Sequence, residues 1–238
     1  MEIHKPHPIH SWRELLKEVG IIVLGVLIAL GAEQSVAALR ERHAADEARQ
    51  NILAELKFNL GFIRDRVSNE PCIDRRLDEL TALLGSARDG ALDPAPTWIG
   101  RPSLDPVLSE RWQSATASGR SSLFDPAEQG KFDVMYSLLA QVFEHETHEQ
   151  IAWTRLRALE TWTGPLGPAA RLAFAEALQE ARYEAWDLKL DAALALGTGK
   201  SLGIELPKAT SLTTSICLPL NTPRSDAVRR LGSPWGEP

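Results

Sequence analysis

The feature that most constrains this chain is an uncharged apolar run near its N-terminus. Residues 19–32 read VGIIVLGVLIALGA. As a helix this run rises about 21 Å, whereas the hydrocarbon core of a bilayer is about 30 Å thick. Leu15 and Leu16 lengthen the apolar stretch upstream, and residues 36–39 lengthen it downstream. We therefore predict one transmembrane helix, with its flanks, over residues 12–39.

Individual residues of this segment fit a membrane anchor. Trp12 suits the membrane–water interface, and Lys17 can extend its ammonium group toward the headgroups. Glu33 lies near the opposite end of the run, where a carboxylate can also reach the headgroups. Gly25 and Ala29 form a small-xxx-small pair, which permits close contact between helices in lipid. Small residues that simply face lipid are the alternative interpretation of that pair.

A cleaved signal peptide is the competing interpretation of the apolar run. Residues 35–37, Ser-Val-Ala, have the small-x-small form of a cleavage site. Glu14 and Glu18 oppose cleavage, because the leader of a signal peptide is basic. The helical pattern also continues through the site without Pro or Gly, although a protease needs an unwound segment. We expect the helix to be retained.

The orientation of the anchor depends on the cysteines more than on charge. Three basic residues lie on each side of the run, so the positive-inside rule gives no preference: Lys5, Arg13 and Lys17 before it, and Arg40, Arg42 and Arg49 after it. Cys72 and Cys217 both follow the anchor and can pair in an oxidising compartment. Two unrelated buried thiols are the alternative. With the disulfide, residues 1–11 are a cytoplasmic leader and residues 40–220 an extracytoplasmic domain.

The anchor segment also resembles segments of known proteins. Lys17-Glu18 with the following IIVLGVLIAL is similar to the short N-terminal anchors of uncharacterised bacterial single-pass inner-membrane proteins, which are grouped only as domains of unknown function. The resemblance covers about twenty residues of the 238. It implies a bacterial inner membrane, with the main domain then periplasmic, and it brings no catalytic residues.

The remainder of the chain predicts a mainly α protein, in which the transmembrane helix continues into a long stalk helix followed by an antiparallel helical bundle. Apolar residues after the anchor repeat at three and four positions, as on one face of a helix: Leu53, Leu56, Leu60, Ile63 and Val67. This stripe extends the first helix to about residue 67. It can pack within the domain or pair with a second copy of the chain.

Prolines and glycines predict the other helix boundaries. Further helices are expected over residues 71–90, 107–118, 126–162 and 168–197, with a proline-rich loop over 91–106. Pro71, Pro126 and Pro168 are interpreted as first-turn residues, and Gly90, Gly197 and Gly199 as helix ends. The helix after Pro168 carries a seam of small and apolar residues that favours close packing: Phe174, Leu178, Ala181, Ala185, Leu188, Ala192 and Ala195.

The C-terminal part of the chain has a different character. Residues 200–220 are rich in Ser, Thr and β-branched residues, so we expect a short extended segment, or a strand pair, laid across the helices. Cys217 would fasten that segment to the helix that carries Cys72. The tail over residues 221–238 contains three prolines and two glycines, and we expect it to be flexible.

His145, His148 and Glu149 form the most ligand-like cluster in the sequence. Zinc accepts histidine and carboxylate ligands from one helix face together with a further ligand. The zinc-protease pattern requires histidines four residues apart, whereas these are three apart. A charged, solvent-facing stretch of helix is the alternative. Acidic neighbours should also raise the pKa of these histidines.

Other chemistry is not indicated. The net charge of -6 and the pI near 5.6 argue against nucleic acid as a partner. The GTGKS segment at 197–201 has Leu194 where a phosphate-binding loop needs its first glycine. There is no nucleophile elbow and no dinucleotide fingerprint, so no cofactor is expected.

We therefore expect a non-enzymatic, membrane-anchored scaffold or partner-binding protein of the bacterial envelope. Its expected partners are the lipid bilayer, another protein, and a second copy of itself through the anchor and stalk. One alternative is a ligand-sensing helical domain that acts through a partner membrane protein. The other is a metal-dependent enzyme that uses the histidine cluster.

Overall fold

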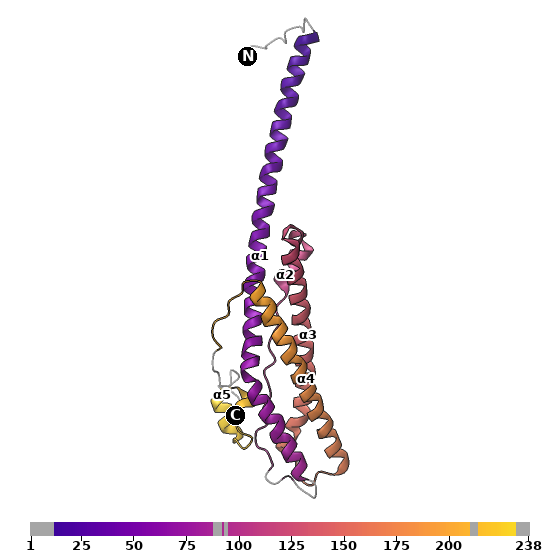
Figure 1. Cartoon of the computed structure of the whole chain (residues 1–238), viewed down its shortest axis with the longest axis vertical. Coiled ribbons are helices and arrows are strands. Elements are labelled where there is room, and N and C mark those ends of the chain that lie inside the picture. The colour runs from indigo at the N-terminus through magenta and orange to yellow at the C-terminus, as the bar shows by residue number, and fades with distance from the viewer. Residues whose placement is uncertain (1–11, 88–91, 93–94, 210–213, 232–238) are drawn as a thin grey trace, which may run out of the picture.

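The computed structural model describes residues 12–87, 92, 95–209 and 214–231. The predicted cytoplasmic leader, residues 1–11, and the predicted helix end at Gly90 lie outside the described residues. Within them the chain is mainly helical and contains no strand, so the predicted fold class is confirmed. Figure 1 shows a single helix that extends far beyond the rest of the protein.

Helix α1 (Trp12–Ser86) has 75 residues and contains both the predicted anchor and the predicted stalk. The prediction of a helix break before Pro71 was wrong, because Pro71 lies inside α1. An internal proline removes a backbone hydrogen bond and crowds the preceding turn, so the helix needs support on both sides of it. Leu60 before the proline and Ile73 after it are both buried in the core. Figure 1 shows the continuous helix bending in its lower part.

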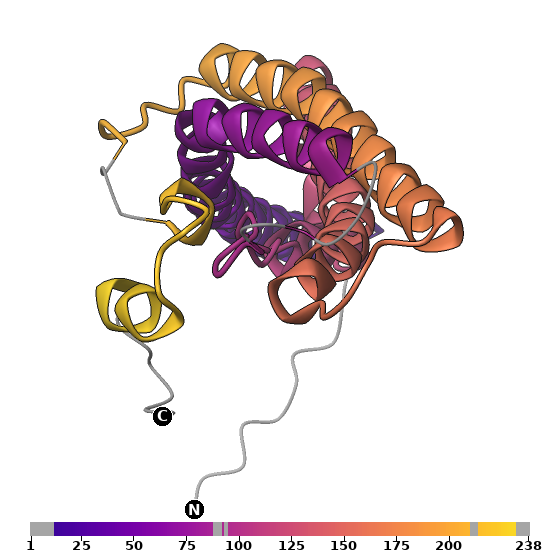
Figure 2. The same ribbon diagram turned by 90° about the horizontal axis from the view of Figure 1, so that it is seen from below.

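Two further long helices, α3 (Pro126–Arg157) and α4 (Pro168–Ser201), pack against each other and against α1. Helix α4 runs antiparallel to α1, because rising residue numbers on α4 meet falling numbers on α1: Arg182 meets Asp78, Lys189 meets Glu70 and Gly199 meets Leu60. Figure 2 shows the three helices around a common centre. The short helix α2 (Glu110–Ala117) and the 3-10 turn η2 (Arg120–Leu123) lie on the anchor side of this assembly (Figure 1).

The predicted helix starts at Pro126 and Pro168 are confirmed, whereas the helix expected from residue 107 begins at Glu110. The Asp125 carboxylate accepts hydrogen bonds from the backbone N–H groups of Ala127 and Glu128, at 2.9 and 3.2 Å, and Pro126 opens α3. Helix α4 begins at Pro168. Helix α3 passes at Arg157 into a 3-10 turn, η3 (Ala158–Thr161), so the helical path ends close to the predicted residue 162.

The predicted end of α4 at Gly197 and Gly199 was wrong, since the helix continues to Ser201. Gly199 is required for packing, because a Cβ atom there would overlap the Leu60 side chain of α1. Gly203, with a φ of 75°, ends the helix instead. Its N–H donates to the Lys200 carbonyl and the Ile204 N–H donates to the Gly199 carbonyl, which are the two bonds of a Schellman motif.

The core consists of two main apolar clusters along the three long helices. The cluster nearer the anchor includes Ile52, Leu56, Leu60, Trp112, Phe132, Met135, Leu139 and Leu188. The other includes Ile73, Leu77, Leu80, Trp153, Leu156, Phe174, Leu178, Ala181 and Ile216. The predicted seam on α4 is confirmed, because its members are buried except Ala185, which is partly buried.

Polar side chains of α1 fix the segment that leads into α2. The Asn59 amide donates to the Leu108 carbonyl at 2.8 Å and accepts from the Leu108 N–H at 3.0 Å. The Glu55 carboxylate accepts from the Arg111 N–H at 3.0 Å and from the Tyr136 hydroxyl at 2.6 Å. Helix α2 therefore has a defined position beside α1 without making a long helical contact.

The C-terminal segment differs from the prediction in two ways. Residues 215–217 form a 3-10 turn, η4 (Ser215–Cys217), and no strand pair is present in the described part of residues 200–220. Helix α5 (Arg224–Leu231) lies in the tail that was expected to be flexible. Its Ala227 is fully buried against Trp98 and Leu218, and this apolar contact explains why the segment is ordered there.

Candidate functional site

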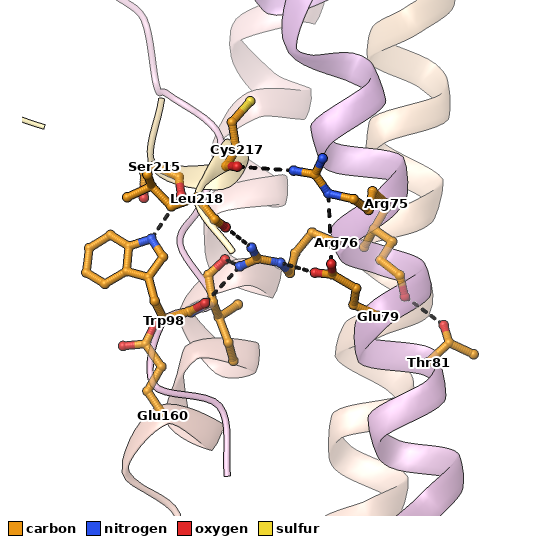
Figure 3. Close-up of polar contacts among 11 residues, drawn as sticks. Arg75, Arg76, Glu79, Thr81, Trp98, Glu160, Ser215, Cys217 and Leu218 are labelled. Atoms are coloured by element: carbon orange, nitrogen blue, oxygen red, sulfur yellow. Dashed lines mark hydrogen bonds and ion pairs between the residues drawn. The ribbon is translucent and has the colours of Figure 1, made fainter. Parts of the chain in front are cut away.

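Arg76 of α1 is the centre of the polar contacts that hold the C-terminal segment (Figure 3). Its side chain is 0% exposed. The guanidinium donates to the backbone carbonyls of Trp98, Ile99 and Leu218 and to the Glu79 carboxylate. One side chain thus satisfies acceptors from two irregular segments that could not be buried without a donor.

The surrounding contacts make this region a structural junction. The Trp98 indole N–H donates to the Ser215 carbonyl at 2.9 Å, as Figure 3 shows. Gly100 has a φ of 70°, and a Cβ atom there would overlap the backbone of Ser215. The predicted pair is present, because Cys72 and Cys217 are joined by a disulfide. The polar groups of Arg76, Trp98 and Ser215 bond to other parts of the same chain, so we assign the residues of this junction to fold stability.

A buried ion pair joins α1 to α3. The Arg66 guanidinium donates to both carboxylate oxygens of Glu149, at 2.7 and 2.8 Å, and the two side chains are 6% and 0% exposed. A bidentate pair of this kind uses both carboxylate oxygens. Glu149, the third residue of the predicted metal ligand set, is therefore buried and already bonded to a cation.

Glu146 lies beside this ion pair and is also buried. Its carboxylate accepts the backbone N–H of Asp105 at 3.4 Å. Burial raises the pKa of Glu146 to about 7; Arg66 opposes the rise and Asp105 adds to it. Because Arg66 is already bonded to Glu149, Glu146 keeps its proton at pH values well above those at which a glutamate ordinarily loses it.

Replacing Glu146 by glutamine is expected to remove a pH dependence of stability. The folded pKa of about 7 lies above the ordinary 4.5, so the native state binds the proton more tightly than the unfolded chain does. Wild-type stability should consequently fall as the pH rises from 4.5 through about 7. Near pH 8 Glu146→Gln should be more stable by about 3 kcal/mol, and near pH 4 the two should agree within about 1 kcal/mol.

Urea unfolding at both pH values measures this difference. Glu144→Gln is the matched control, since Glu144 is an exposed carboxylate on the same helix. A stability gain that does not change with pH would contradict the assignment of the proton to Glu146.

His145 faces α4. Its Nδ1 lies 2.7 Å from Glu184 Oε2 and 4.0 Å from Asp187 Oδ2, while its Nε2 lies 3.8 Å from Asp191 Oδ2. His148 also approaches Glu184, at 3.8 Å. Candidate metal-ligating atoms therefore converge from His145, Glu184 and Asp187, within 4.8 Å of one another. His145 and His148, the two predicted histidine ligands, both approach the carboxylate of Glu184, which lies on α4 and was not among the predicted ligands.

The electrostatics of this cluster favour a protonated histidine. Burial lowers the pKa of His145, but the hydrogen bond and charge of Glu184 and the charges of Asp187 and Asp191 outweigh it, so the pKa is raised. The predicted direction is confirmed for His145. A histidinium cation there offsets one of the three negative charges that the packing of α4 onto α3 brings to it.

The anchor residues all lie on α1, and nothing in the described chain covers them. Trp12, Lys17, Gly25, Ala29 and Glu33 are exposed. Among the described residues α1 is the one helix long and apolar enough to cross a membrane, with a window of mean hydropathy 2.2 that is 0% buried. An exposed apolar surface of this kind is typical of a membrane or protein contact site.

The outward side of α4 carries a second apolar surface, which the sequence interpretation missed. Tyr183, Trp186, Leu190 and Leu194 are 60%, 57%, 47% and 58% exposed. Their spacing places them on one face of α4, opposite the buried seam. We call these four residues the α4 outer face. A helical projection of residues 168–201 would have shown two apolar stripes instead of one.

The anchor and the α4 outer face therefore present large apolar side chains outward. The Arg76 junction and the Arg66–Glu149 pair face inward. No family model, curated protein or solved structure matches this chain.

Proposed function

We propose that this protein is a membrane-anchored helical scaffold of the bacterial inner membrane, and that its domain acts by binding another protein rather than by catalysis. The α4 outer face is the observation that carries the proposal. Tyrosine and tryptophan are typical of protein interfaces, and a row of large apolar side chains on a folded surface marks a contact site.

The occupant that fits this face best is a second copy of the chain. Copies anchored in one bilayer share one orientation, so their α4 helices stand parallel and at the same height. Tyr183, Trp186 and Leu190 are spaced three and four residues apart, which is the core spacing of a parallel coiled coil.

The proposed location is the inner membrane, with the N-terminus in the cytoplasm and the domain in the periplasm. The Cys72–Cys217 disulfide supports an oxidising compartment for the domain. The resemblance of the anchor to those of bacterial inner-membrane proteins supports the choice of membrane.

Replacing Leu190 by glutamate is expected to convert a dimer into a monomer. A charge buried at the centre of the interface should weaken association at least about tenfold. Light scattering of the full-length protein in detergent, after size-exclusion chromatography, measures the mass. Val134→Glu is the matched control, because Val134 is 53% exposed on α3, away from the α4 outer face, and that variant should stay dimeric.

Crosslinking in native membranes gives an independent test. A Leu194→Cys variant should form a disulfide-linked dimer, whereas Val134→Cys should not. A monomeric wild-type protein that also fails to crosslink through Leu194→Cys would overturn the second copy as occupant.

Ligand sensing is the second candidate, and one observation favours it. A cleft of about 360 Å³ is lined by Trp112, Tyr136 and Phe143, and the Trp112 and Tyr136 rings stack at 5.6 Å. A screen of heteroaromatic compounds for a rise in Tm that disappears in Trp112→Leu would support it. Metal-dependent catalysis through the predicted set of His145, His148 and Glu149 gains no comparable support, because Glu149 is bonded to Arg66.

A further inference from the structure

Two adjoining clefts are lined by residues of α1 and of the α2–η2 segment. Figure 1 shows that this segment lies on the side of the domain nearer the anchor. Their volumes are about 330 and 440 Å³, and Ala44 and Arg120 line both. We call the combined cleft the juxtamembrane groove. Much of its lining consists of small residues from α1 and from the α2–η2 segment: Ala44, Ala48, Ser114, Ala115 and Gly119.

The groove gathers three arginines from α1 and the α2–η2 segment. Arg40, Arg111 and Arg120 line it, all three are exposed, and none of their guanidinium groups has an ion pair or hydrogen bond with a described residue. Glu41 and Glu47 also line the groove without an ion pair there, so three cations face two anions. Unpaired guanidinium groups present donors in the geometry that fits a phosphate.

The groove lies at headgroup height if the chain is anchored as proposed, and the inference rests on that proposal. A helix covers a hydrocarbon core of about 30 Å in about twenty residues. Counted from Val19, the core therefore ends near Leu39, and Arg40 follows directly. Basic residues next to a membrane helix are placed to meet anionic headgroups.

Two exposed leucines lie at or next to the groove. Leu123 lines it and is 51% exposed, and Leu39, the residue before Arg40 on α1, is 55% exposed. A ligand with a charged head and an apolar body matches this combination of arginines and exposed apolar side chains. A free anion has no apolar part that could contact the two leucines.

We propose that the juxtamembrane groove binds the phosphate headgroup of an anionic phospholipid. Arg40 and Arg120 contact the phosphate, Arg111 extends the basic wall, and the acyl chains lie along Leu123 and Leu39. Bound lipid would fix the α2–η2 segment against the stalk part of α1 and set the height of the domain above the bilayer. Inorganic phosphate shares the headgroup chemistry, so the test separates the two sources.

Native mass spectrometry of the full-length protein in a mild detergent provides that test. The protein is equilibrated with an equimolar mixture of phosphatidylglycerol and phosphatidylcholine. Wild type should retain phosphatidylglycerol in preference, and Arg40→Gln and Arg120→Gln should each lower that retention about fivefold. Arg42→Gln is the matched control, because Arg42 is exposed two residues from Arg40 and does not line the groove.

Equal losses in all three variants would overturn the groove in favour of general attraction between basic residues and anionic lipid. Displacement of the lipid by millimolar inorganic phosphate, or no preference in wild type, would also overturn it. An alkaline wash of native membranes keeps the two proposals separate. A chain that washes out overturns the anchor, whereas a chain that stays but shows no lipid preference overturns only the groove.

Discussion

Arg76→Met is expected to lower the free energy of unfolding by about 3 to 5 kcal/mol. Methionine fills similar space but donates no hydrogen bond, so the carbonyls of Trp98, Ile99 and Leu218 lose their shared donor inside the protein. Urea unfolding of the full-length protein in detergent, followed by tryptophan fluorescence, measures the loss. We expect Arg76→Lys to recover only part of it, because an ammonium group cannot reproduce the planar fork.

Arg75→Met is the matched control for this prediction. Arg75 is the neighbouring residue, is 51% exposed and donates to the Cys217 carbonyl at 3.1 Å. Its replacement should cost less than about 1 kcal/mol. Similar losses for the two variants would contradict the assignment of Arg76 as the centre of the junction.

Removing both cysteines, as Cys72→Ala with Cys217→Ala, should destabilise the protein by about 5 kcal/mol. The disulfide closes a loop of 145 residues, and a long loop restricts the unfolded chain strongly. The same unfolding experiment measures the loss, with and without a reducing agent. The reductant should destabilise wild type and leave the double variant unchanged. An unchanged wild type under full reduction would contradict the prediction.

The two effects should not be additive. Arg76 and the disulfide both fasten residues 217 and 218 to α1, so either change releases the same segment. A combined variant should therefore lose less than the sum of the separate losses.

Features with a local cause could be predicted from the sequence. Asp125 with Pro126, and Pro168, start helices because a cap or a first-turn proline acts on its own turn. The apolar run of the anchor and the seam on α4 are equally local patterns. The cysteine pair followed from there being only two thiols, both after the anchor.

Features decided by distant contacts were missed. Pro71 stays inside α1 because packing on both sides holds the helix together, and Gly199 stays inside α4 because Leu60 lies against it. Arg76 was overlooked because a charged residue suggests a surface. It nevertheless lies three residues after Ile73 and one before Leu77, on the buried stripe, and that position was the available signal.

The unbroken path of α1 also has a mechanical consequence. At 1.5 Å per residue, its 75 residues form one helix about 110 Å long along its path, which passes from the apolar run into the core and bends in its lower part. Once one end is embedded, the other cannot swing independently of it. A bilayer of different thickness, which changes the tilt of an embedded helix, would shift the far end like the tip of a lever. With the apolar run embedded as proposed, the lipid around it would thereby set how far the domain stands from the bilayer.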